Sequence, residues 1–224
     1  MPGKNPVGEN MNCAGPMPRL FNNALKTICM LILLFTAATA HGEPPAKDVL
    51  AEINLARTTP QAYAGFLREF RRQFKGKSYR LDSRTLVQTV EGVKAVDEAI
   101  RFLSRKKPLP PLGWSDGLAA AAAELADEQA SSGAIDHNGQ SGGMRKRIER
   151  QGEWQVEIGE NIGYGPDDAR LMVMQLIIDD GVPDRGHRKN TFLKAFGKAG
   201  VACAPHPRFG NMCVIDFAGG FKGF

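Results

Sequence analysis

The sequence predicts a three-layer α+β domain, and two observations support this fold class. Apolar residues recur at helical spacing in several segments, whereas a few short segments alternate between apolar and polar residues as half-buried strands do. The chain also ends in two apolar segments, 200–203 and 213–217, joined by a turn region with Pro and Gly, which is typical of an antiparallel hairpin. Helices that alternate with a few antiparallel strands pack in layers around a core.

Residues 1–40 are expected to form a secretory signal peptide. An apolar run, 28–37, follows Lys26 and leads to an A-x-A cleavage site at 38–40. This run is too short for the roughly 20 residues of a transmembrane helix, so we expect no transmembrane segment. Cleavage near Ala40 leaves one domain, 41–224, in a secreted or periplasmic protein. Translation can begin at any of three methionines, which are Met1, Met11 and Met17.

The cysteines fit an exported protein. Two of the four lie in the signal peptide, and the other two, Cys203 and Cys213, form an even pair near facing ends of the final hairpin. Because exported proteins meet oxidising conditions, we expect one disulfide between them. The formal net charge of +5 is modest, and we expect no nucleic-acid partner.

The first half of the domain is predicted to be mainly helical. One helix covers 47–57, and a second begins at Pro60 after Thr59 as its N-cap. Segment 68–84 carries seven basic residues with aromatic residues between them. A solvated face or loop is the plainer interpretation, and a ligand surface is the alternative.

A short strand, 84–90, and a helix, 93–103, follow this basic segment. An alanine-rich helix then covers 118–130, with Ser115 or Asp116 as its cap and Gly133 at its end. It leads to His137.

The next elements place a second histidine, His187, shortly after the end of a helix. Glycines bracket a short basic helix, 144–148, and residues 154–158 alternate as a strand. Apolar spacing from Leu171 to Ile178 predicts a helix that Gly181 would stop as its C′ residue. Two aspartates, Asp179 and Asp180, therefore fall at the negative end of this helix, a placement that disfavours them unless a cation or metal is near.

Four polar residues stand in turns with glycines and are our candidate site: His137, Glu160, Asp180 and His187. Imidazole nitrogens and carboxylate oxygens together can hold a divalent metal, and zinc is the expected one. The same groups can shift one another's pKa for acid–base catalysis, with Glu160 and His187 as the catalytic candidates. A polar network that fixes the loops without binding anything is the plainer alternative.

The order of these motifs resembles the CAP superfamily of cysteine-rich secretory, antigen 5 and pathogenesis-related type 1 proteins, in the form found in bacterial members with an SCP domain. The resemblance covers about 47–224 and is carried by the helix that leads to His137, by Gly159-Glu160-Asn161-Ile162, and by Asp180 with Gly186-His187-Arg188. It implies an α-β-α sandwich with a cleft lined by two histidines and two acids, which by position are the four candidates. Residues 72–111 look like an elaboration of the minimal fold.

Supporting roles are expected for four more residues. Arg185 and Arg188 would balance the charges of Asp179 and Asp184, and Asn161 would hold the loop around Glu160. Position 180 holds Asp where the family usually has Glu, so its reach toward a shared metal is shorter by one methylene.

Three functions remain open from the sequence. The first is an exported CAP domain that binds a divalent metal and a small or lipidic ligand. The second is a metal-dependent or acid–base hydrolase of a peptidase-like kind, although the sequence has neither an H-E-x-x-H nor a G-x-S-x-G motif. The third is a module that binds lipid, sterol or the cell envelope through the basic segment 68–84, with the four candidates in a structural role.

Overall fold

The structure is a computed structural model that describes residues 45–81 and 84–224, so the expected signal peptide lies outside the described residues. The helices are α1 (Ala46–Thr58), α2 (Pro60–Arg71), α3 (Val93–Arg105), α4 (Asp116–Ser132), α5 (Met144–Gln151), α6 (Ala169–Ile178) and α7 (Gly186–Thr191). The strands are β1 (Phe74–Lys75), β2 (Ser78–Arg80), β3 (Leu86–Gln88), β4 (Gly113–Trp114), β5 (Asn138–Gly139), β6 (Gly142–Gly143), β7 (Gly152–Tyr164), β8 (Lys198–His206) and β9 (Gly210–Gly223).

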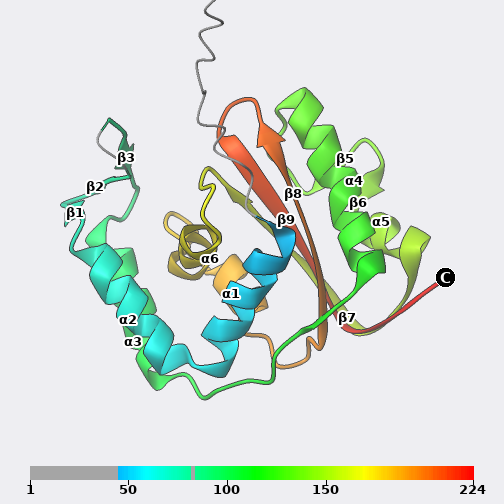
Figure 1. The fold of residues 1–224 in the computed structure, drawn as a ribbon, viewed down its shortest axis with the longest axis horizontal. Helices are drawn as coiled ribbons and strands as arrows, with labels where there is room; N and C mark the ends of the chain where they lie inside the picture. The colour runs from blue at the N-terminus through cyan, green and yellow to red at the C-terminus, as the bar shows by residue number, and fades with distance from the viewer. Residues whose placement is uncertain (1–44, 82–83) are drawn as a thin grey trace, which may run out of the picture. The chain divides into compact units, whose positions relative to one another are not determined.

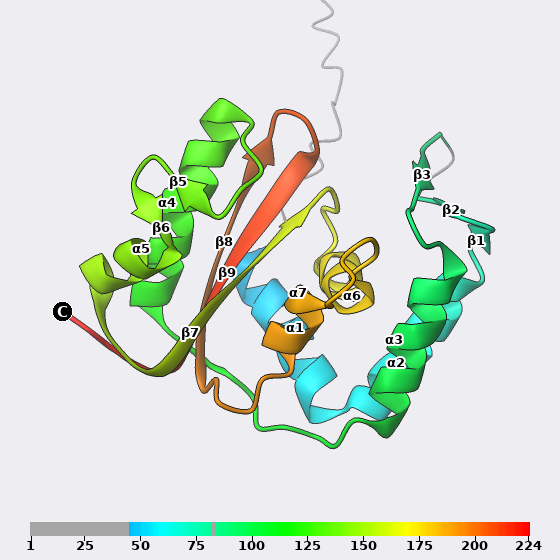
Figure 2. The same cartoon turned by 180° about the vertical axis from the view of Figure 1, so that it is seen from behind.

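A four-stranded sheet of order β4-β8-β9-β7 forms the middle layer. Strand β9 pairs antiparallel with both β7 and β8, while the short β4 pairs parallel with β8, so the sheet is mixed. Helices α4 and α5 cover one face, and α1, α6 and α7 cover the other (Figures 1 and 2). The predicted three-layer α-β-α sandwich is confirmed.

Alternation along β9 explains why both faces of the sheet are covered. Cys213, Ile215 and Phe217 pack in the core beneath α1 and α6, whereas Met212 and Val214 pack in the core beneath α4. A strand that buries apolar side chains on both faces needs a helical layer on each.

The final hairpin forms as the sequence predicted. Cys203 and Cys213 are directly paired across β8 and β9 and are joined by a disulfide with a Cα–Cα distance of 4.0 Å. Helix α4 also has the predicted ends, because the Ser115 hydroxyl accepts from the amide of Leu118 and Gly133 is left-handed. Among the described residues, no helix is long and apolar enough to span a bilayer.

One helix end differs from the prediction. Helix α6 stops at Ile178, and the left-handed residue at its C-terminus is Asp179 with φ 57°, not Gly181, which lies two residues further on. Asp is one of the few non-glycine residues that adopt this conformation readily. Because the left-handed residue is Asp179 and not Gly181, the aspartate that lies in the site is Asp179 and not Asp180.

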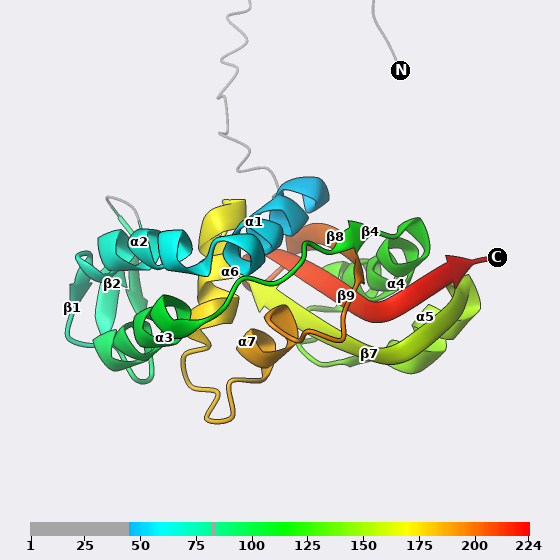
Figure 3. The same ribbon diagram turned by 90° about the horizontal axis from the view of Figure 1, so that it is seen from below.

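Residues 72–111, which we predicted to be an elaboration of the minimal fold, form a lobe with α2 that shares the main core. Helices α2 and α3 lie side by side, and a small antiparallel sheet, β1-β2-β3, stands at their far end (Figure 3). One face of this sheet carries Phe74, Tyr79 and Val87, which pack into the main core with Phe70. Since side chains alternate along a strand, Lys75, Arg80 and Leu86 belong to the opposite face, and all three are exposed.

Candidate functional site

His187 and Asp179 form a close pair at the C-terminal end of α6. The Asp179 carboxylate accepts from the His187 Nδ1 at 2.6 Å and from the His187 amide at 2.9 Å. The aspartate side chain is only 2% exposed, whereas that of His187 is 25% exposed. The left-handed turn at Asp179 is therefore held by the start of α7, and the Nε2 edge of the imidazole is the one left for a ligand.

Asp180, the predicted metal ligand, is occupied elsewhere. Its carboxylate oxygens accept from the backbone amides of Val90 at 2.6 Å and Glu91 at 2.8 Å, just before α3. The structure thus brings Asp179, which we had expected in a supporting role, into contact with the second histidine. Asp180 joins the α6 end to the elaboration.

The two arginines after this loop also bond to the elaboration. Arg185 donates to Glu91 at 2.6 Å and to Glu98 at 2.6 Å, and Arg188 donates to Glu98 at 2.9 Å. Hydrogen bonding from Arg185 lowers the pKa of Glu91 to about 2. The charge of Asp179 acts on the Arg188 side chain, as we expected, but the hydrogen bonds of both arginines to Glu91 and Glu98 fix the loop between α6 and α7 against α3.

The first histidine lies on the other side of β7. His137 Nδ1 lies 2.7 Å from Glu160 Oε1, and Arg147 donates to Glu160 Oε2 at 2.5 Å. Glu160 and Arg147 are almost fully buried, while the His137 side chain is 55% exposed. The hydrogen bond to Glu160 raises the pKa of His137, and partial burial opposes that shift.

Asp216 completes this buried group and was not anticipated. It faces Glu160 across the β7–β9 ladder and is fully buried. Burial, followed by the neighbouring Glu160 carboxylate, raises the pKa of Asp216 well above its usual range. A charged residue inside the apolar run 213–217 was the sequence feature that could have identified it; Arg147, in the short basic helix, had no such feature.

Asparagines connect the two halves through β7. Because residues alternate along the strand, Glu160 faces α5 and Asn161 faces α7. Asn161 donates to the His187 carbonyl at 3.0 Å and accepts from Asn190 at 3.0 Å, and Asn190 also donates to the Glu160 carbonyl. Asn161 therefore holds the second histidine, in addition to the loop that we expected it to hold.

The four predicted ligands do not form a single metal-binding set. Within 45–81 and 84–224, no group of three or more His, Cys, Asp or Glu side chains is arranged to hold a metal ion. Glu160 and Asp179 use their oxygens on the histidine Nδ1 atoms and on other donors. What remains for a metal is the Nε2 atom of each imidazole.

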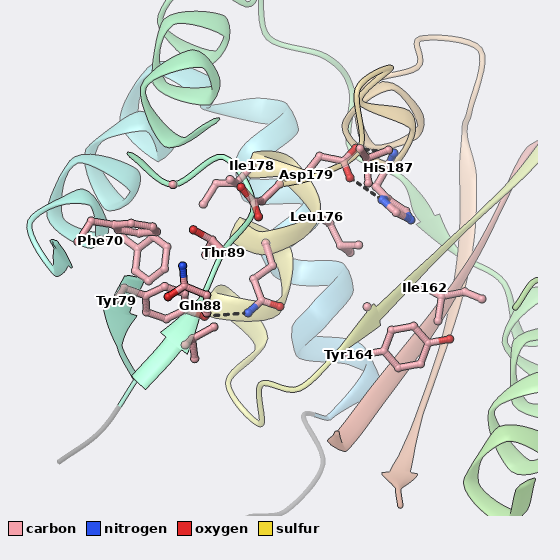
Figure 4. A pocket seen from close by; sticks show the side chains of 17 residues that line it. Phe70, Tyr79, Gln88, Thr89, Ile162, Tyr164, Leu176, Ile178, Asp179 and His187 are labelled. Atoms are coloured by element: carbon pink, nitrogen blue, oxygen red, sulfur yellow. Dashed lines mark hydrogen bonds and ion pairs between the residues drawn. The ribbon is translucent and has the colours of Figure 1, made fainter. Parts of the chain in front are cut away.

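A pocket of about 300 Å³ opens beside His187. Figure 4 shows Phe70 and Tyr79 on one side of it, Ile162 and Tyr164 on the other side, and Leu176 and Ile178 between these two groups. The polar groups on its wall include Asp179, His187, Thr89 and Gln175, which donates to the Tyr79 hydroxyl at 3.2 Å. The pocket is therefore apolar over most of its wall and has a histidine at one edge.

His137 opens instead into a separate hollow with Arg145 and Lys146. The sequence suggested one cleft with both histidines. In the structure, the segment of β7 that carries Glu160 and Asn161 separates their surroundings.

Comparison with known proteins agrees with the fold. The family model described as "CAP: Cysteine-rich secretory protein family" matches residues 50–217. No curated protein gives a match to the chain.

Two solved structures are similar. One is an extracellular protein containing an SCP domain from Bacillus anthracis str. Ames, with 20% identity and a TM-score of 0.42 over 56% of this chain and 37% of that one. The other is an outer surface protein from Borrelia burgdorferi, with 18% identity and a TM-score of 0.42 over 52% of this chain and 80% of that one. The chain thus spans well under half of the Bacillus protein.

Proposed function

Because the chain belongs to the CAP, or cysteine-rich secretory protein, family, we propose that it is an exported protein whose domain binds a small amphipathic ligand in the pocket beside His187. The observation that carries this proposal is the mostly apolar pocket with one hydrogen-bonding imidazole at its edge. A molecule with an apolar chain and one polar head group matches that arrangement.

The size and lining of the pocket support a small ligand. Pockets of 300–1,000 Å³ with apolar walls and a few fixed polar groups are usual for small-molecule sites, and this pocket has about 300 Å³. The aromatic side chains Phe70, Phe74 and Tyr79 pack edge-to-face or tilted against one another, which keeps this wall in place without a ligand.

The head group would bond to His187 Nε2. Asp179 holds the imidazole by its Nδ1 atom, so the direction in which Nε2 points is fixed before binding. Preorganisation of this kind lowers the entropic cost of binding.

A fluorescence titration with a dansyl-labelled undecanoic acid tests the proposal. We expect saturable binding to the processed protein and its loss in Thr89→Trp, which fills the pocket from its wall. Ser131→Trp, on the exposed end of α4, is the matched control and should bind as the unchanged protein does. Equal binding by both variants would show that the probe sits elsewhere.

A second candidate function is divalent metal binding, and the bonding of the two histidines favours it. Histidines that ligate metals usually donate their other ring nitrogen to a carboxylate, and His137 and His187 each have such a partner. The Nε2 atom of each histidine would bind an ion of its own, with water completing the coordination, because β7 separates the surroundings of the two rings. A bound zinc would lower the pKa of that water, which is the chemistry that the hydrolase hypothesis needs.

Calorimetry with zinc chloride tests this candidate. We expect binding near pH 7.5 that is lost in the His137→Ala, His187→Ala double variant. Since Glu160 raises the pKa of His137, protons compete with the metal, and affinity should fall as pH drops through the histidine range. Unchanged affinity in the double variant would refute it.

A further inference from the structure

We propose that the outer face of the small sheet β1-β2-β3 docks on a lipid bilayer that contains anionic phospholipid. The observations behind this proposal concern Lys75, Lys77 and Leu86, which are not among the residues that line the ligand pocket. Three features combine in the elaboration: a sheet with one buried and one exposed face, excess positive charge, and exposed apolar residues.

One face of the small sheet packs into the core, and the other carries exposed side chains. Phe74, Tyr79 and Val87 share the inner face and wall the pocket. Lys75 and the cross-strand pair Arg80 and Leu86 share the outer face.

Positive charge is concentrated in the elaboration. Residues 72–111 contain ten Lys and Arg against four Asp and Glu, whereas the rest of the chain has 19 against 20. The formal charge of the whole protein therefore comes from this lobe.

Three of the four acidic residues of the lobe pair with arginines outside the small sheet. Glu91 and Glu98 pair with Arg185 and Arg188, and Asp97 pairs with Arg71. Lys75 and Lys77 are exposed and make no ion pair within the described part of the chain. Lys75 and Lys77 therefore supply the positive charge of the proposed docking surface.

Exposed apolar residues lie in the same lobe. Leu86 is 62% exposed, Val90 64% and Leu81 42%, and these are three of the six large hydrophobic residues that the described chain exposes. Leu86 lies on the outer face itself, Leu81 follows β2, and Val90 follows β3 shortly before α3.

A bilayer fits this combination better than other partners. Each basic residue near an anionic membrane raises the affinity of a protein for that membrane about fivefold. Apolar side chains between the basic residues enter the membrane–water interface. An anionic polysaccharide or nucleic acid would match the positive charge but would leave Leu86 exposed to water. A second copy of this chain would bring two strongly basic lobes together.

Sedimentation with vesicles tests the proposal. The processed protein, with its N-terminus established by mass spectrometry, is mixed with phosphatidylcholine vesicles with or without phosphatidylglycerol, at low and high salt. We expect binding that needs phosphatidylglycerol and weakens with salt. Lys75→Glu, Lys77→Glu should weaken binding at least tenfold, and Leu86→Ser about threefold or more.

Matched variants show whether the outer face is responsible. Lys194→Glu, Lys222→Glu makes the same charge change outside the elaboration, and Ile135→Ser removes an exposed apolar residue elsewhere; each should change binding less than twofold. If these control variants lose as much vesicle binding as the outer-face variants, the proposal is wrong. It is also wrong if the protein binds dextran sulfate as tightly as vesicles and Leu86→Ser leaves both affinities unchanged. Thr89→Trp should block the pocket probe and retain vesicle binding, so failure of one proposal is distinguishable from failure of the other.

Discussion

Replacing Asp216 by Asn should stabilise the protein near neutral pH. The Asp216 side chain is fully buried, and neither of its carboxyl oxygens accepts a hydrogen bond from the described residues. It lies opposite Glu160, and burial together with that carboxylate raises its pKa well above the usual range. Asn keeps the shape of the neutral carboxyl group and has no proton to lose.

The sign and size of the effect follow from proton linkage. Because the folded state binds the Asp216 proton more tightly than the unfolded state does, its contribution to stability is complete below the ordinary aspartate pKa. Stability is then lost as pH rises through the raised pKa, at roughly 1 kcal/mol per pH unit. The variant should match the unchanged protein near pH 4 and exceed its free energy of unfolding by about 2–4 kcal/mol at pH 7.

Urea denaturation of both proteins from pH 4 to pH 7 measures this difference, and subtraction removes the contribution of groups that titrate in both. Asp184→Asn is the matched control: its side chain is 69% exposed, so it should shift stability by less than about 0.5 kcal/mol. A variant that becomes less stable than the unchanged protein as pH rises would refute the reasoning, because Asp216 would then be a stabilising anion beside Arg147.

Three further predictions concern contacts that support the site. Arg147→Met should cost about 3–5 kcal/mol at pH 7, since it leaves the buried Glu160 carboxylate unpaired; urea denaturation checks this, and a loss below about 1 kcal/mol would contradict it. Asp180→Ala should speed hydrogen exchange at the amides that precede α3, because those two amides lose their acceptor; unchanged rates would show that the contact is unimportant. Cys203→Ser, Cys213→Ser should lower stability by about 3 kcal/mol, from the chain entropy of a short closed loop, and a thermal scan that shows no change would count against a stabilising disulfide.

Local patterns predicted the elements of this fold, because each depends on nearby residues. The Ser115 cap, the Gly133 stop and the final hairpin follow from side-chain and backbone preferences within a few positions. The family resemblance then supplied the layer order, which periodicity alone does not fix.

The site was harder to predict because its contacts depend on tertiary structure. Asp179 adopts the left-handed conformation while the amide and ring of His187, eight residues later, bond to its carboxylate. Nothing local separates it from Asp180, whose partners lie about 90 residues away. Arg147 likewise meets Glu160 only after α5 packs on the sheet, so neither periodicity nor spacing could pair them. The zinc ion and the signal peptide stay predictions.

The most direct test of the central claim is nuclear magnetic resonance of the His187 ring during titration with decanoate. The account predicts a saturable change in the ¹⁵N shift of His187 Nε2, together with nuclear Overhauser contacts from the acyl chain to Tyr79 and Leu176. Saturable binding with an unmoved His187 signal and contacts to other residues would contradict the assignment of the ligand to this pocket.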